Sequence, residues 1–458
     1  MKKKKRDTRP KGKGKPAEKR KPTTGSSDPS PPSGRGFQVL VTLFWLLPAL
    51  VVTARAQESF RLPKQILSEM LVVVSLLLLS IRLRHVERVD FRVLLRHPAI
   101  LALLPLLLVA TFTLATSDHP DHVNRGIFSL WIGAVALWGW SLGLRRDEFP
   151  RVLRALTLPA LALSLIAWAQ YFEWFEVFQF QDELKERISL TSLAGGAFDL
   201  SAYLVLPCLL AQVAWLHGPA GWRIAWGATA ILLAATVALT QTLSAAVALV
   251  VGSILLWRRR LSPRRWAMAF GIVVAVALVA GLAIEPLRDR VAKKVDNVAE
   301  GDINQLLTGR LDAWRGAWWM LTQNPWTGVG QGAYRAEYGE ARLALHQEGV
   351  RFYRRQHQPY FVNAHNEPLE VAAETGIPGT LALLFGLAVL ARSLRRGNWN
   401  EEEASLFPAV LAVIGILALT NFPFRVALVG YPMILFVSWV FAVPTGPGSE
   451  NAAEGGET

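Results

Sequence analysis

Long apolar runs recur along the chain and define its architecture. Each run has 15 to 20 residues, about the length at which an α-helix crosses a bilayer, and Arg-rich or Pro/Gly-rich breaks separate the runs. The sequence therefore predicts an all-α, polytopic membrane protein with about twelve transmembrane helices. The candidate spans are residues 37–54, 66–81, 98–115, 127–144, 155–172, 199–216, 223–240, 242–257, 267–284, 377–392, 406–421 and 428–443.

Basic residues are distributed unevenly over the connecting loops. They gather after the second, fourth, eighth and tenth spans, whereas loops 117–122 and 173–186 are acidic or mixed. Because short basic loops tend to stay in the cytoplasm, this alternation predicts that both termini are cytoplasmic. The arginines concerned are Arg82, Arg84, Arg88, Arg92, Arg96, Arg145, Arg146, Arg151, Arg154, Arg258, Arg259, Arg260, Arg264, Arg265, Arg392, Arg395 and Arg396.

Most of the net charge lies in one N-terminal segment. Of the formal charge of +14, residues 1–35 contribute +10, from 13 Lys/Arg against 3 Asp/Glu. This Pro/Gly/Ser-rich composition predicts a disordered cytoplasmic tail that orients the protein and attracts anionic lipids. Nucleic-acid binding is the alternative, but the segment has no aromatic residue or recognition motif to favour it. Residues 444–458 are predicted to form a second disordered cytoplasmic tail.

Two short features limit the chemistry. Ala54-Arg55-Ala56 has the form of a signal-peptidase site, but the long basic region and the spanning length of the first run favour an uncleaved helix. The single cysteine, Cys208, excludes an intrachain disulfide and a Cys-cluster metal site. His346, His357 and His365 are irregularly spaced, so we expect neither a metal nor another cofactor.

One connecting segment is far longer than a connection requires. Residues 285–375 separate nine spans within 36–284 from three spans within 376–443, and the orientation places them outside. Long loops of this kind are usually functional. The segment is nearly balanced, with eleven basic and twelve acidic residues, but Arg351, Arg354 and Arg355 cluster among aromatic residues. Such clustering favours a pocket for a compact anion; the aromatics are equally suited to stacking on sugars or packing at the membrane interface.

The first predicted helix of this loop begins near Thr308, which could cap it, and ends at Asn324-Pro325. Its i, i+4, i+8 row is Arg310, Trp314 and Trp318, a guanidinium at one end of an aromatic stripe. Arg310 is therefore a candidate anion ligand. The structural alternative is that it pairs with Asp312 or reaches the bilayer surface.

A glycine-rich turn follows at residues 324–334, NPWTGVGQGAY. Gly328, Gly330 and Gly332 alternate, which suits a turn where side chains would obstruct close backbone approach. Its amides could cradle a phosphate, although the turn lacks the Lys-Ser/Thr pair of a nucleotide-binding loop.

His365 lies directly before a short acidic helix. Asn366 is a plausible N-cap, Glu367 and Pro368 fit the first turn, and Gly376 fits a left-handed terminus before the tenth span. A neutral imidazole at this place could accept a proton from a hydroxyl. A lone histidine here could also be structural, so the neighbouring motifs decide its meaning.

Three ordered motifs together carry a resemblance. They are Thr-Gly-Arg with Trp four residues on (308–314), Asn-Pro-Trp-Thr-Gly-Val-Gly-Gln-Gly (324–332), and His-Asn followed by nine residues and Gly-Ile-Pro-Gly (365–379). This combination resembles the O-antigen ligase/polymerase superfamily. The resemblance implies a metal-independent, inverting glycosyltransferase of the C-type architecture in the bacterial inner membrane. Its active loop would be periplasmic, where it takes a glycan from undecaprenyl pyrophosphate to a glycan or lipid acceptor.

The resemblance also implies residue roles. His365 matches the histidine proposed as a general base or acceptor-orienting group, and Arg310 matches an arginine proposed to contact the pyrophosphate. Members commonly carry a second arginine where this chain has Leu243 and Ser244. Arg187 is the leading substitute. The predicted substrate-binding residues are Arg187, Arg354, Arg355, Trp314, Asn366, Gly328 and Gly330.

Three functions are compatible with these features. The first is the transferase, with ligase as the nominal choice and polymerase as the alternative. The second is a transporter or flippase of lipid-linked sugars, which would place polar residues within the spans, where the sequence has few. The third is an inactive relative that acts as an assembly partner, because the usual second arginine is missing.

Overall fold

The computed structural model describes residues 45–53, 60–83, 95–174, 190–258, 303–352 and 361–442, with single positions between 260 and 299. The predicted ninth span, both tails, Arg187, Arg354 and Arg355 lie outside the described residues.

Every regular element in these ranges is a helix, as the apolar pattern predicted. Within the described residues, seven helices are long and apolar enough to cross a membrane, and two shorter apolar helices accompany them, so the count of about twelve is not confirmed. The elements are α2 (Arg61–Leu83), α4 (Pro98–Phe112), η1 (Thr113–Ala115), α5 (Pro120–Gly143), α6 (Phe149–Arg154), α7 (Thr157–Tyr171), α8 (Ala197–His217), η4 (Ala220–Trp222), α9 (Arg223–Leu239), α10 (Leu243–Trp257), α13 (Ile303–Leu306), α14 (Arg310–Gln323), α15 (Tyr334–Gln347), α16 (Glu367–Arg396), α17 (Glu401–Thr420), η5 (Pro423–Arg425) and α18 (Ala427–Phe441).

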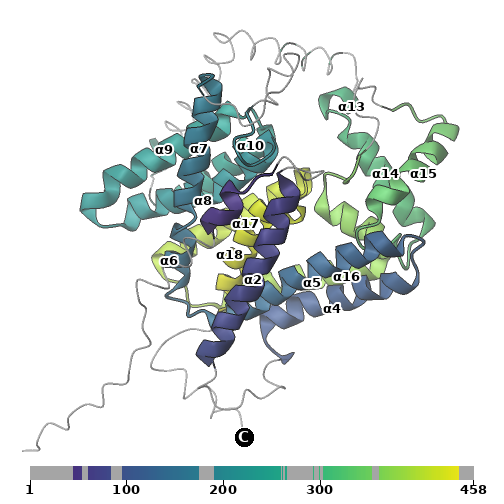
Figure 1. Ribbon diagram of the computed structural model, residues 1–458, viewed down its shortest axis with the longest axis horizontal. Helices are drawn as coiled ribbons and strands as arrows, with labels where there is room; N and C mark the ends of the chain where they lie inside the picture. Colours follow the sequence, from purple (N-terminus) through teal and green to yellow (C-terminus); the bar gives the residue numbers. More distant parts are fainter. Residues whose placement is uncertain are drawn as a thin grey trace, which may run out of the picture.

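The bundle is built around α8, in which 83% of the apolar membrane-spanning stretch is buried. Helices α9, α10 and α17 pack on α8 (Figure 1). Helices α2, α9 and α16 instead carry exposed large apolar side chains, such as Met70, Ile231 and Leu381. Contiguous exposed apolar surface of this kind suits contact with lipid tails. The fold is therefore that of a multi-pass membrane protein.

Two Arg-rich loops meet the first turn of α17 at one end of the bundle. Arg146 Nε donates to Glu403 Oε1 at 2.9 Å, Arg154 pairs with Glu402 at 2.9 Å, and Arg260 pairs with Glu401 at 2.7 Å. These glutamates form the first turn of α17. The loops after the predicted fourth and eighth spans thus lie on the same side, as the alternation of basic loops requires.

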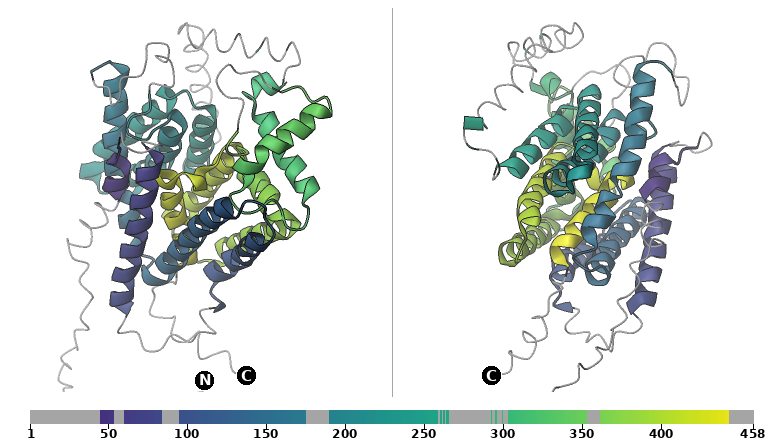
Figure 2. Two further views of the ribbon diagram at one scale, coloured as in Figure 1. Left: turned by 45° about the vertical axis from the view of Figure 1, so that its right-hand side comes forward. Right: turned by 90° about the vertical axis from the view of Figure 1, so that its left-hand side faces the viewer.

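Helices α14 and α15 form the outer unit beside the bundle, next to α16 (Figure 2). Helix α14 begins at Arg310 because Gly309, with a φ of 82°, is its N-cap. The predicted Thr308 cap is wrong: Thr308 has a φ of 54°, and its hydroxyl donates to Leu307 O at 2.7 Å. Trp318, at the end of the predicted row, is exposed.

The glycine-rich turn packs against a break in α16. Gly376 has a φ of 66° and separates a short acidic helix from the membrane helix, as the sequence predicted. The amides of Val329 and Gly330 donate to Ala373 O and Glu374 O at 3.0 and 2.9 Å. A Cβ on Gly328 would lie 2.3 Å from Glu374 backbone atoms. The turn needs glycine because two backbones touch there.

Candidate active site

The short acidic helix holds the segment that carries His365. Glu370 is fully buried; its carboxylate accepts from Asn363 Nδ2 at 2.9 Å and from the Ala364 amide at 2.8 Å. Asn366 caps the helix by accepting from the Leu369 amide at 3.0 Å, as predicted. His365, between these anchors, has a φ of 53°, which is uncommon for a side-chain-bearing residue. The helix thus holds the backbone on both sides of the histidine.

Arg425 connects this helix to the segment after α17. Its guanidinium lies 3.1 Å from Glu370 and 2.6 Å from Glu374, both fully buried. Glu367 accepts from the Phe424 amide at 2.8 Å. Buried carboxylates require such partners, because removing a charge from water is costly. The network therefore locks η5 against the start of α16.

Asn421, directly after α17, is the point where four segments meet. Its side-chain amide donates to Ser244 Oγ at 2.9 Å. Its Oδ1 accepts from Arg310 Nη2 at 3.4 Å and lies 3.5 Å from His365 Nδ1. The residue is 2% exposed. The structure therefore brings Arg310 and His365, which are 55 positions apart in the sequence, to one carboxamide oxygen.

The surroundings of His365 keep its ring uncharged. The imidazole meets the rings of Phe361 and Phe422 edge-on, at centroid distances of 5.7 and 4.9 Å. Burial and the charge of Arg310 lower the pKa of His365 to about 4, with a further contribution from Arg61, against the opposing hydrogen bond to Asn421. At neutral pH the ring is therefore neutral, the form that accepts a proton.

Arg61, in the first turn of α2, also lies against Phe422. Its Cζ is 5.5 Å from the centroid of the Phe422 ring. Its Nε and Nη2 donate to the two carboxylate oxygens of Asp199 at 2.8 and 3.0 Å. In Figure 1 the upper end of α2 lies close to the segment that follows α17.

The other predicted site residues have mixed surroundings. Trp314 is half-buried, and its indole Nε1 has no hydrogen-bond partner among the described residues. The amides of Gly328 and Gly330 donate to Asn324 O and Glu374 O, both at 2.9 Å. These two amides are therefore engaged in hydrogen bonds within the protein.

Asn421, Ser244 and Arg61 were not among the predicted site residues. Asn421 ends an apolar run directly before Phe-Pro, a weak signal for a polar group at a helix end. Ser244 stands where the resemblance expects an arginine, and it reaches the site through Asn421. Arg61 precedes Leu-Pro-Lys at the start of a span, a position equally suited to a membrane anchor.

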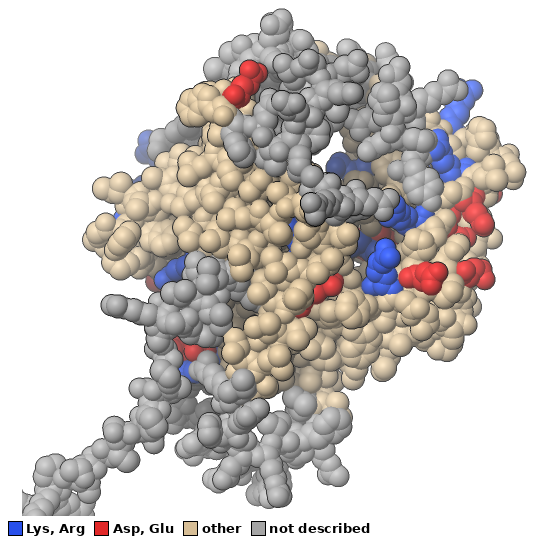
Figure 3. Space-filling view, in the orientation of Figure 1, with Lys and Arg blue, Asp and Glu red and all other residues tan. Residues whose placement is uncertain are grey.

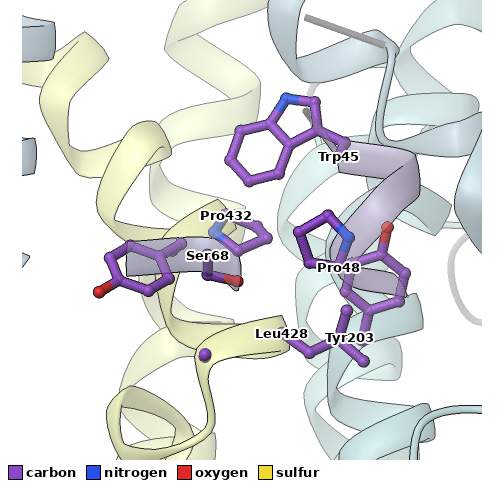
Figure 4. A pocket seen from close by; sticks show the side chains of 8 residues that line it. Trp45, Pro48, Ser68, Tyr203, Leu428 and Pro432 are labelled. Carbon is purple, nitrogen blue, oxygen red and sulfur yellow. The ribbon is translucent and has the colours of Figure 1, made fainter. Parts of the chain in front are cut away.

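Charged groups and the apolar cavity lie in different places. Figure 3 shows that many charged side chains on the described surface gather over the region of α14 and α15. The cavity in Figure 4 lies instead between α2, α8 and α18, lined by Trp45, Pro48, Ser68, Tyr203, Ala427, Leu428, Tyr431 and Pro432. This lining has no charged side chain and shares no residue with the cluster around Asn421, which contains both a guanidinium and an imidazole.

Comparison with known proteins agrees with the motifs. Residues 228–384 match the family model described as O-Antigen ligase. The match confirms the resemblance to the O-antigen ligase superfamily and indicates a membrane enzyme of the ligase/polymerase type. It covers α10, α14, α15 and the first half of α16, and hence Ser244, Arg310 and His365. The comparison with curated proteins found no match to this chain.

Proposed function

We propose that the protein transfers a glycan from undecaprenyl pyrophosphate to an acceptor hydroxyl at the external face of the membrane. One observation supports this most directly: Arg310 and His365 both contact Asn421 Oδ1. A cation for a phosphate group and a neutral base for a hydroxyl thus stand side by side, which is what glycosyl transfer from a diphosphate requires.

His365 is the proposed general base. The amide of Asn421 donates to Ser244, so its oxygen faces the histidine and accepts from Nδ1–H. Nε2 then carries the lone pair. In the proposed step, the acceptor oxygen attacks the anomeric carbon from the face opposite the diphosphate, and its proton passes to Nε2. The bond from the anomeric carbon to the diphosphate oxygen breaks, with inversion.

Arg310 is proposed to stabilise the departing diphosphate. Negative charge accumulates on this group as the glycosidic bond breaks, and a guanidinium offers it two parallel donors while remaining charged. Diphosphate is a good leaving group, so no general acid is required. The proposed mechanism needs neither a metal nor a pair of catalytic carboxylates.

The family match leaves two acceptors open, and a product analysis distinguishes them. A ligase attaches the glycan to a lipid acceptor, whereas a polymerase lengthens a lipid-linked repeat. We propose ligase activity first. Accumulation of unattached polymer in a deletion strain would support the ligase, and accumulation of unpolymerised repeats would support the polymerase.

The test is transfer of a lipid-linked glycan by the purified protein in proteoliposomes. We expect His365→Ala and Arg310→Met to lower the rate at least about 100-fold, as loss of a general base or of a charge-stabilising donor does. His217→Ala is the matched control, because His217 contacts Arg260 at the far end of α8. Full transfer by both site variants would refute the assignment. Translocation of the donor without transfer would favour the transporter.

A further inference from the structure

Arg61 is held in place by a buried carboxylate. Asp199, in the first turn of α8, is 0% exposed and accepts two hydrogen bonds from Arg61. The Arg61 side chain itself remains 41% exposed. A buried acid that fixes an accessible guanidinium by a bidentate contact limits its rotamers, so little further ordering is needed when it binds a ligand.

Arg61 and Arg310 both lie near the His365 imidazole. Arg61 and His365 both lie against Phe422, with the guanidinium 5.5 Å and the imidazole 4.9 Å from its ring centroid. Arg310 reaches His365 from another direction, through Asn421. The positive charges of both arginines act on the His365 imidazole. The imidazole thus lies in the field of two cations that come from α2 and α14.

We propose that Arg61 is the second cation of the site and binds the diphosphate of the lipid-linked donor together with Arg310. This inference rests on the proposed transferase function. A diphosphate presents charged oxygens on two phosphorus atoms, so two guanidinium groups on different helices can contact it at once. Ser244, where the resemblance expects an arginine, contacts Asn421 instead, and α2 supplies the charge.

The competing interpretation is that Arg61 only neutralises Asp199. Substitution of Arg61 alone does not distinguish these two interpretations, because Arg61→Met leaves a buried carboxylate unpaired and destabilises the protein. Replacing both Arg61 and Asp199 does distinguish them. In Arg61→Met/Asp199→Leu, apolar side chains of similar size remove the buried charge, and such replacements are often neutral for stability. The double variant therefore keeps the fold while lacking the cation.

The experiment measures binding of inorganic pyrophosphate and the donor KM for the full-length protein in detergent or proteoliposomes. We expect the double variant to melt close to wild type, yet to bind pyrophosphate about 10- to 100-fold more weakly and to raise the donor KM similarly, as loss of a charged hydrogen bond does. Arg61→Lys should weaken pyrophosphate binding less, because lysine keeps the positive charge. Arg154→Met, in a pair at the opposite end of the bundle, is the control and should bind as wild type does.

Two outcomes would overturn the inference. One is wild-type pyrophosphate affinity and donor KM in a folded double variant; the other is no pyrophosphate binding by the wild-type protein. Failure of the proposed function gives a different pattern. If the wild-type protein transfers no glycan, the transferase function fails, and weaker pyrophosphate binding in the double variant would still support an anion site that contains Arg61.

Discussion

The two ends of α17 use asparagine in different ways. At the first end, Asn400 forms a capping box with Glu403, and the acidic first turn pairs with Arg146, Arg154 and Arg260. At the other end, Asn421 contacts Ser244, Arg310 and His365. Arginines gather at both ends, so their number in the sequence does not identify the site.

The difference lies in what the arginines act on. At the first end, each arginine lies against a glutamate of the same short turn, so the contacts join loops to a helix. At the second end, the positive field acts on a buried imidazole and lowers its pKa to about 4. A helix end that stabilises the fold and one suited to chemistry are thus separated by the length of α17 (Figure 1).

The largest effect on stability is expected from Arg425→Met. It would leave the buried carboxylates of Glu370 and Glu374 without their cation, and loss of one partner of a buried pair costs about 3–5 kcal/mol. Thermal melting and accumulation in membranes measure this loss. Melting unchanged from wild type would show that this network does not hold the site end together.

Asn421→Ala tests the site end of α17 directly. We expect transfer to fall about 100-fold because both Arg310 and His365 lose their shared contact and small displacements at a reacting centre have large effects. Asn421→Asp adds a more specific readout. A carboxylate beside His365 raises its pKa, so the acid limb of kcat/KM should move to higher pH, which a purely structural role would not produce.

Asn400→Ala is the matched substitution at the other end of the same helix. Loss of an N-cap costs about 1 kcal/mol of stability and should leave the transfer rate unchanged. Melting and transfer are measured on the same preparation as Asn421→Ala. Equal loss of transfer in both variants would remove the functional distinction between the two ends.

Arg154→Met should have a still smaller effect. Its ion pair with Glu402 is partly exposed, at 35% and 23% for the two side chains, and such pairs contribute less than about 1 kcal/mol. The expected result is a melting temperature within a few degrees of wild type and normal transfer.

The smallest effect on kcat/KM is expected from changes of pH between about 5 and 8. Because the pKa of His365 is lowered from 6.5 to about 4, the neutral base predominates throughout this range, and its protonation should reduce kcat/KM only as the pH falls toward 4. Stability linked to this histidine would be lost as the pH falls from 6.5 through 4, since the unfolded chain binds the proton first. An acid limb of kcat/KM near pH 6.5 would contradict the burial of His365 and the effect of the nearby arginine charges on its pKa.

Short sequence patterns predicted several helix ends correctly. Asn366 caps its helix and Gly376 has a positive φ, because capping and left-handed geometry depend on a few adjacent residues. The same reasoning failed at Thr308, where Gly309 takes the cap position. The Thr308 hydroxyl donates to Leu307 O instead of accepting from an amide of α14, so it does not cap the helix.

The sequence by itself determined the helical membrane fold and the helix of α14, because hydrophobic periodicity depends on residues close together in the chain. Arg310 and His365 were singled out by the motifs that carry the family resemblance. Only the tertiary structure decided that Asn421 joins these two residues and that Arg61, paired with Asp199, lies against Phe422 beside the same imidazole. Contacts between residues far apart in the chain depend on how helices pack, and a polar residue at a helix end has the same local pattern whether it faces lipid headgroups or a reacting group.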